Sequence, residues 1–221
     1  MASHSTPATP ACCTPRSAGP GRPKDPGKRI AILDAAKRLF LLNGFDGTSM
    51  DQIAAEAGVS KLTVYSHFGD KDKLFAEAVR AHCEQNLPDA LFAPAPDVPL
   101  RQRLSDIGHA FYAMVMAPEA IAGHRILCSP QAASNGMPTL FWEAGPKRVQ
   151  DAFADLLQRR IDAGELEIDD TQCAAAQFFT LLKGEPHAQA VFGFCCSARE
   201  VTPQAHVASV VDLFLRAYAR R

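Results

Sequence analysis

Apolar residues recur at intervals of three and four along most of this chain of 221 residues, which is the spacing of amphipathic helices. One stripe of this kind lies near the front of the chain and consists of Ile30, Leu33, Ala36, Leu39 and Phe40. Another lies near the C-terminus and consists of Val207, Val210, Val211, Phe214 and Tyr218. No alternation of apolar and polar residues is long enough to predict a β-strand. The pattern therefore predicts an all-α fold.

Helix-starting and helix-ending residues divide this pattern into segments. Gly44 ends the first stripe, and Thr202 followed by Pro203 opens the last helix. Four of the sixteen prolines fall within residues 87–99, which we expect to be an irregular connection. The expected helices cover residues 28–43, 49–57, 60–68, 70–85, 100–116, 118–128, 146–163, 170–182 and 186–192, with a last one from residue 203 onward.

The stretch from Ser49 to Phe68 predicts two short helices joined by a tight turn. Ser49 fits an N-cap, and Gln52 three residues later completes a capping box. Gly58 stands where the first helix must end and the chain must turn, and Ser60 fits the N-cap of the second helix. A helix, a glycine-containing turn and a second helix form the helix-turn-helix pattern. In this motif the front of the second helix enters the major groove of DNA.

The second of these helices carries an unusual density of hydrogen-bond donors, namely Lys61, Thr63, Tyr65 and His67. Lys71 follows at the start of the next helix. A cation at a helix N-terminus is unfavourable for the helix dipole, whereas a phosphate held there together with the lysine is favourable. These donors therefore strengthen the prediction of DNA binding.

Residues 48–75, TSMDQIAAEAGVSKLTVYSHFGDKDKLF, resemble the DNA-binding signature of TetR-type transcriptional regulators. The matching residues are Thr48, Ile53, Ala54, Ala57, Gly58, Val59, Ser60, Thr63, Tyr65, Phe68, Lys71 and Leu74. Residues 141–192, with the runs FWEAGP and LLKGE, are similar to the C-terminal domain of the AefR-like subgroup. The resemblance implies a helix-turn-helix DNA-binding domain followed by a helical-bundle domain for effector binding and dimerisation.

The first 25 residues are rich in Pro, Ser, Thr, Ala and Gly, a composition typical of disordered segments. Arg16, Arg22 and Lys24 make the second half of this segment basic. Two interpretations stay open, a solvated tail or an arm that reaches the minor groove of bound DNA. We therefore divide the chain into a disordered basic arm (1–25), a DNA-binding domain (26–72) and an effector-binding and dimerisation domain (73–221).

The resemblance also implies a homodimer whose two recognition helices enter successive major grooves of a palindromic operator, with half-sites about 34 Å apart. By matching positions, Lys61 and Thr63 are candidates to read base edges, and Leu62 is a candidate to meet a thymine methyl group. Positions that usually hold phosphates in the family are matched by Thr48, Tyr65, His67 and Lys71. For Tyr65 and His67 a purely structural role stays open. The whole predicted DNA interface is Thr48, Ser60, Lys61, Leu62, Thr63, Tyr65, His67 and Lys71.

The second domain carries aromatic and methionine residues that suit an apolar pocket as well as a core. In view of the resemblance, we predict that six of them line a cavity for an apolar effector: Phe111, Met114, Phe141, Trp142, Phe153 and Phe178. The alternative for each is ordinary core packing. The implied mechanism is a population shift, in which the effector favours a conformer whose two recognition helices no longer match the groove spacing.

The last two long helices are the candidates for dimerisation, because their apolar stripe is wider than a single surface helix requires. The predicted interface comprises Phe179, Leu182, Val207, Val210, Val211, Phe214 and Tyr218. Burial of the same residues within a single chain is the alternative.

The net charge of −1 hides a difference between the two parts of the chain. Residues 1–82 carry 11 basic and 8 acidic side chains, whereas the remainder carries 12 and 16. A modestly basic front part suits a partner with a phosphate backbone. No apolar run approaches the roughly 20 residues that span a membrane, and the N-terminus lacks the apolar core of a secretory signal. We therefore expect a cytoplasmic protein with no membrane partner.

Other chemistry finds little support in the sequence. No Ser/His/Asp arrangement, paired-carboxylate motif, Walker loop or dinucleotide fingerprint is present, so we predict that the protein is not an enzyme. The seven cysteines show no C-x-x-C spacing, and we expect neither a metal nor a cofactor. Two alternatives stay open: a thiol sensor acting through Cys128, Cys195 or Cys196, and a transcriptional activator in place of a repressor.

Overall fold

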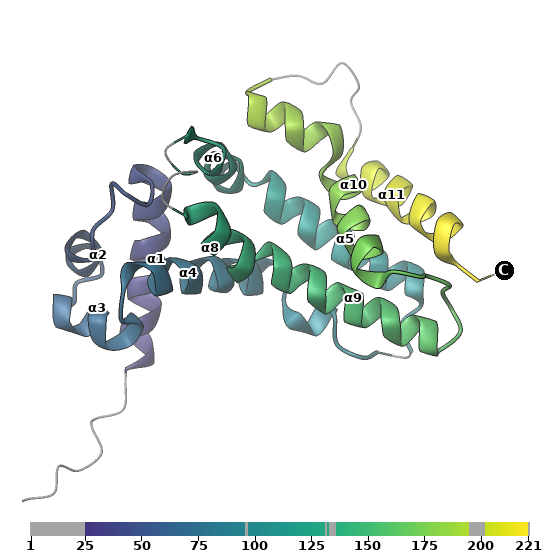
Figure 1. Ribbon diagram of the computed structural model, residues 1–221, viewed down its shortest axis with the longest axis horizontal. Coiled ribbons are helices and arrows are strands. Elements are labelled where there is room, and N and C mark those ends of the chain that lie inside the picture. The colour runs from purple at the N-terminus through teal and green to yellow at the C-terminus, as the bar shows by residue number, and fades with distance from the viewer. Residues whose placement is uncertain (1–24, 96, 131, 133–135, 195–201, 221) are drawn as a thin grey trace, which may run out of the picture.

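The computed structural model describes residues 25–220 except 96, 131, 133–135 and 195–201 (Figure 1). Its helices are α1 (Pro26–Asn43), α2 (Met50–Glu56), α3 (Lys61–Phe68), α4 (Lys71–Asn86), the 3-10 helix η1 (Asp89–Leu91), α5 (Leu100–Met116), α6 (Pro118–Leu127), α8 (Met137–Ala144), α9 (Pro146–Asp162), α10 (Thr171–Phe192) and α11 (Pro203–Tyr218). Within these ranges the only strand-like pairing is one isolated bridge between Leu166 and Ala219. The all-α prediction is confirmed, and the predicted arm lies outside the described residues except for Asp25.

Local capping chemistry sets the helix starts that the sequence predicts. The Ser49 hydroxyl accepts from the Gln52 backbone N–H at 3.2 Å, and Gln52 Oε1 accepts from the Ser49 backbone N–H at 2.8 Å. Ser60 caps α3 in the same way, and Asp70 caps α4 through the Lys73 backbone N–H at 2.8 Å. The turn between α2 and α3 passes through Gly58 at φ 65°, a conformation that a side chain would strain. The predicted helix-turn-helix is therefore present.

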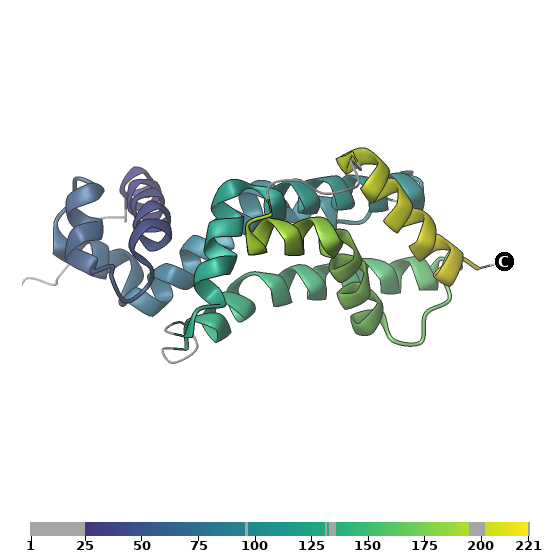
Figure 2. The same cartoon turned by 90° about the horizontal axis from the view of Figure 1, so that it is seen from above.

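Two apolar cores organise the molecule. Figures 1 and 2 show an elongated shape, with α1, α2 and α3 packed together at one end and α9, α10 and α11 toward the other. The first core includes Ile32, Phe40, Ile53, Val64, Phe68, Leu74 and Phe75. The second core includes Leu104, Ile107, Phe153, Leu157, Phe178, Leu182, Val211 and Phe214. Met137 of α8, a helix outside the expected set, is buried in the first core, so the front unit packs directly on the second domain.

Helix α4 joins the two parts. Leu74, Phe75 and Ala78 in its front half belong to the first core, and α8 packs along its length (Figure 1). The front half of α4 belongs to the first core, and α4 also contacts α5 and α8 of the second domain. A displacement of α4 against these helices therefore moves the helix-turn-helix unit relative to the second domain. None of the described helices is both long enough and apolar enough to cross a bilayer.

Helix α10 is broken at Gly184, where φ is 50° and ψ is −158°. Pro186 follows inside the second half and has no backbone N–H to donate to the carbonyl of Leu182. His206 of α11 supplies the missing donor, with its Nε2 2.8 Å from that carbonyl. The break therefore matches the expected division of this segment into two helices, and α11 satisfies the carbonyl that the break exposes.

Candidate functional site

The exposed surface of α3 lies at one tip of the molecule (Figure 1). Val64 and Phe68 are buried and fix the inner face of the helix on the first core. The front of the outer face carries Lys61 and Leu62, and Leu62 is 79% exposed although it is apolar. An exposed leucine can contact a thymine methyl group, and an exposed lysine can donate to a base edge. Their place at the front of a short, well-anchored helix is therefore compatible with contact in a major groove.

Lys61 forms an ion pair with Asp51 of α2, with its Nζ 2.8 Å from Oδ1. The hydrogen bond that Lys61 donates to Asp51 raises the pKa of Lys61, and the Nζ also lies 6.0 Å from the centre of the Tyr65 ring. Both partners of the ion pair are more than half exposed, so the pairing is weak and a nucleic-acid group can compete for the lysine. The sequence analysis did not anticipate Asp51 because the pair links two helices across a turn.

The remaining predicted residues of α3 lie on its outer side or at its ends. Ser60 Oγ accepts from the Thr63 backbone N–H and lies 2.8 Å from Thr63 Oγ1, so both hydroxyls belong to the N-cap. Tyr65 is exposed, and His67 is half-buried with its ring beside that of Phe68. The structure thus brings six predicted residues together on one helix: Ser60, Lys61, Leu62, Thr63, Tyr65 and His67.

In the free chain, Thr48 and Lys71 bond to the backbone of the loop between α1 and α2, and their contacts with phosphate stay a prediction. Thr48 is only 1% exposed, and its hydroxyl donates to the backbone carbonyl of Gly44 at 2.7 Å. The Lys71 ammonium donates to the carbonyls of Phe45 and Thr48 at 3.0 and 3.3 Å and lies 4.2 Å from the centre of the Phe45 ring. Both side chains therefore hold the loop between α1 and α2 in place. The loop carbonyls are one favourable partner for the lysine at the start of α4, and a phosphate contact of Lys71 is untested.

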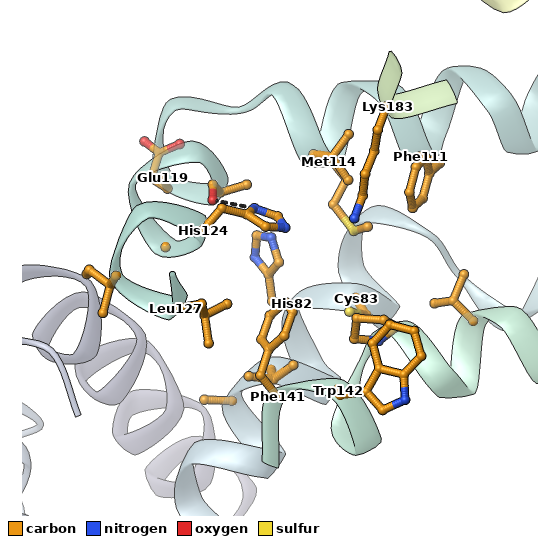
Figure 3. Close-up of a pocket in the computed structure, with 18 of the residues that line it drawn as sticks. His82, Cys83, Phe111, Met114, Glu119, His124, Leu127, Phe141, Trp142 and Lys183 are labelled. Atoms are coloured by element: carbon orange, nitrogen blue, oxygen red, sulfur yellow. Dashed lines mark hydrogen bonds between the residues drawn. The ribbon is translucent and has the colours of Figure 1, made fainter. Parts of the chain in front are cut away.

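A cavity of about 500 Å³ lies between the helix-turn-helix unit and the bundle (Figure 3). Its walls come from α1, α4, α5, α6, α8, α9 and α10. Four of the predicted ligand residues line it: Phe111, Met114, Phe141 and Trp142. The other two do not, because Phe153 and Phe178 are fully buried in the second core with their rings stacked 4.8 Å apart. Aromatic residues of core and cavity have the same helical spacing, so the sequence could not separate them.

Polar side chains also line this cavity, and none of them was predicted from the sequence. Among them are His82 of α4, His124 of α6 and Lys183 of α10 (Figure 3). Burial lowers the pKa of each of these groups, and the nearby Lys183 charge lowers the pKa of His124 further. His124 Nδ1 lies 2.8 Å from the Ala120 carbonyl, so this nitrogen carries the proton in the neutral ring.

His187 lies behind His124, with the two ring centres 4.8 Å apart. Burial is the main cause that lowers the pKa of His187 to about 4, and the charges of His124 and Lys183 add to the effect. Its Nε2 is buried without a hydrogen-bond partner in the part of the chain that the structure covers. His187 is therefore neutral near pH 7.

Among the described cysteines, Cys83 is an unreactive thiol, and the thiol-sensor alternative stays untested. Burial raises the pKa of the Cys83 thiol to about 11, which disfavours the reactive thiolate. Cys128 is exposed, and the other two candidates of the sensor hypothesis, Cys195 and Cys196, lie outside the described residues. Across the described ranges, no group of three His, Cys, Asp or Glu side chains is arranged to hold a metal ion.

The predicted dimer stripe packs inside the chain. Six of its seven residues, Phe179, Leu182, Val207, Val210, Val211 and Phe214, are buried in the second core. Tyr218 is half-buried and donates its hydroxyl proton to Gln177 at 2.7 Å. The assignment of these residues to an interface is therefore corrected, because α5 and α9 already cover the stripe. The face left exposed on the same two helices carries Leu181 and Leu213.

Two family models match the chain. The model of the tetR family of bacterial regulatory proteins covers residues 32–78, from α1 into α4. The model of the AefR-like transcriptional repressor C-terminal domain covers residues 102–220, which is more than half of the chain. The two models therefore account for both parts of the fold.

Individual proteins give the same picture. The HTH-type transcriptional regulator YezE of Bacillus subtilis is 28% identical over 149 residues, which cover 65% of this chain and 75% of YezE. The solved structure of the flavonoid-responsive regulator FrrA is 33% identical and covers 88% of this chain and 98% of its own, with a TM-score of 0.67. A SmeT–triclosan complex is 26% identical and covers 87% and 92%, with a TM-score of 0.62.

Proposed function

The chain belongs to the TetR family of bacterial transcriptional regulators, and on that premise we propose that it is a homodimeric repressor released from a palindromic operator by a small, mainly apolar effector. It is a DNA-binding regulator by family, as its relatives are. We propose no catalytic role, and we place its action in the cytoplasm, where its DNA partner lies. The observation that carries the proposal is the exposed front of α3, held at the tip of the molecule by a buried inner face.

In the proposed complex, α3 enters the major groove with its N-terminal end. Lys61 and Thr63 meet base edges, and Leu62 packs on a thymine methyl group. Tyr65 and His67 lie farther along the helix and contact phosphates, which fixes the register without reading sequence. Ser60 holds the helix start in the geometry that these contacts need.

The second copy is proposed to pack on the outer face of α10 and α11. On α11 this face presents residues four apart, Ala205, Ser209, Leu213 and Ala217, all of them exposed. Leu181 contributes an exposed leucine from α10. Small residues let two helices approach closely, and the leucines supply apolar area at the centre. A two-fold dimer of this kind must present both α3 helices to one duplex, about 34 Å apart, to bind a palindrome.

The effector is proposed to occupy the cavity between the helix-turn-helix unit and the bundle. Phe40 and Leu41 of α1 and Phe75 of α4 form part of its wall, so a ligand there touches the DNA-binding unit directly. FrrA is a flavonoid-responsive regulator and SmeT forms a complex with triclosan, and both share this fold. A ligand that favours one placement of α1 and α4 shifts the population away from the DNA-competent conformer.

Selection of duplexes from a random library tests the proposal, followed by mobility-shift titration of the enriched sequence. We expect a palindrome whose half-sites lie about one helical turn apart. A reporter placed behind that palindrome and its promoter then separates the repressor from the alternative activator. Failure to enrich any duplex would contradict the proposed DNA binding. Enrichment of a single asymmetric site would contradict the proposed two-fold dimer.

A further inference from the structure

Lys183 is half-buried, and its side chain lines the cavity. It is the last residue of α10 before the break at Gly184, and its side chain runs into the cavity between Met114 and Phe111 (Figure 3). Burial is the sole cause that lowers the pKa of Lys183, and no acidic group among the described residues offsets it. A buried cation without an anion destabilises a protein unless something binds it.

His124 offers a second polar group on the same side of the cavity. Because its Nδ1–H donates to the Ala120 carbonyl, its Nε2 keeps a lone pair. Figure 3 places this ring on the same side of the cavity as the Lys183 side chain, with His82 next to it. The neutral His187 ring packs behind His124, and the pKa of each of these histidines is lowered. The pair therefore presents one donor, Lys183, and one acceptor, His124.

The opposite wall is apolar. Phe141 and Trp142 of α8 lie across the cavity from Lys183 (Figure 3). Val79 and Leu127 are further apolar residues of the lining. Glu119, the acidic residue in the lining, lies on the far side of His124 from Lys183 in the same view. A volume of about 500 Å³ suits a molecule of drug size.

Resting on the proposed function, we propose that the effector is an amphipathic organic acid. Its hydrocarbon or aromatic body packs on Phe141 and Trp142, and its acidic oxygen, from a carboxylate or a phenolic hydroxyl, accepts a hydrogen bond from Lys183. The same acidic group bonds His124 Nε2, directly as a phenol O–H donor or after the ring takes up a proton beside a carboxylate. A carboxylate also supplies the counter-charge that Lys183 lacks in the free protein, whereas a neutral phenol supplies only the hydrogen-bond acceptor.

Two other ligand classes fit less well. A hydrocarbon fills the apolar wall but leaves the Lys183 ammonium buried beside apolar atoms. An amine brings a second positive charge to Lys183, which like-charge repulsion disfavours. The preference for an acidic oxygen is therefore specific to the Lys183 side of the cavity.

Trp142 provides the readout, since it is the only tryptophan of the chain and lines the cavity. The Trp142 fluorescence is titrated with two matched pairs of probes. Decanoate is compared with decanol, and para-hexylphenol is compared with para-hexylanisole. Decylamine, which carries a positive charge in place of the negative charge of decanoate, is a further probe. A charge-assisted hydrogen bond corresponds to about tenfold in affinity. We expect at least one acidic probe to bind about tenfold more tightly than its partner. The pair that shows the difference identifies the source as a carboxylate or a phenol.

Lys183→Met tests the assignment of the amine, because methionine keeps the length of the side chain and removes the charge. We expect this variant to lose the preference for the acidic probe and to keep its affinity for decanol. Lys37→Met is the matched control, since Lys37 lines the same cavity but already donates to Gln85 Oε1 at 2.9 Å. The control is expected to keep the preference.

Operator binding is measured separately by anisotropy, so that the two proposals fail independently. Loss of all DNA binding refutes the proposed function, whatever the probes do. Intact DNA binding with equal affinity for all probes, or with decylamine the tightest, overturns the organic-acid proposal. A preference for the acid that survives in Lys183→Met also overturns it, and a folded helical spectrum for each variant accompanies every titration.

Discussion

Lys71 shows how a residue that matches a family position can serve the fold. Its ammonium donates to the Phe45 and Thr48 carbonyls and covers the Phe45 ring, so it fastens the loop that precedes α2. Lys61 is the opposite case, because its partner Asp51 is exposed and its ion pair is weak. We therefore assign the proposed base contacts to α3. In the free chain, Lys71 holds the loop that precedes α2.

Replacing Lys71 with methionine should lower the free energy of unfolding by about 1–3 kcal/mol, because two partly buried carbonyls lose a charged donor. Lys73→Met is the control, since Lys73 is exposed and forms a surface ion pair with Asp70, so its loss should change the stability much less than the loss of Lys71. Urea unfolding of both variants measures the difference. Equal stability of the two variants would contradict the supporting role of Lys71.

His187 predicts a dependence of stability on pH. Its pKa is about 4 in the folded protein and near 6.5 in an unfolded chain, so the unfolded state binds the extra proton between these values. The free energy of unfolding should therefore fall as the pH drops from about 6.5 to about 4, and His187 should add nothing above that window. His187→Leu should flatten this part of the profile in urea unfolding. A variant with the same slope as the wild type would show that His187 is not the group involved.

At the scale of elements, capping residues made the helix starts predictable. Ser49, Ser60, Asp70 and Thr202 each bond a backbone N–H three residues ahead, so their signal is local in the sequence. The partner of an apolar face is not local. The stripe of α11 predicts burial correctly, but α5 and not a second copy covers it.

The same limit applies to the cavity. Lys183 and His82 are separated by about a hundred residues in the sequence, and nothing in the pattern of either helix shows that they face one space. Phe111 and Phe178 have the same character as apolar helix residues, yet only Phe111 reaches the cavity. Sequence reasoning could therefore propose a pocket in this domain but not its polar side.

The outer face of α10 and α11 yields a test at the same scale. Leu213→Arg should give a folded monomer, because it places a charge at the centre of the proposed interface. Leu42→Arg is the control, since Leu42 is also an exposed leucine but lies on α1, outside that face. Sedimentation at micromolar concentration and a helical spectrum distinguish the outcomes. A dimeric Leu213→Arg protein would place the interface elsewhere.

At the scale of the whole molecule, the cavity occupies the junction between the two cores. Its wall takes residues from α1 and α4, which belong to the helix-turn-helix core, and from α10, which belongs to the bundle. The break of α10 at Gly184 follows directly after Lys183. A ligand bound to the Lys183 amine therefore lies beside the point where the backbone of α10 is not helical. In the proposed dimer, an effector at this junction biases the placement of the two recognition helices.

Binding of a fluorescent palindromic duplex and of a scrambled duplex, over a range of salt concentrations, tests the central claim most directly. For the wild type we predict affinity for the palindrome at least about 10³-fold above the scrambled duplex, falling linearly with the logarithm of salt. Lys61→Ala should lose about 1–3 kcal/mol on the palindrome and much less on the scrambled duplex. A wild-type protein without salt-sensitive affinity for any duplex, or with equal affinity for both, would contradict a recognition helix in the major groove.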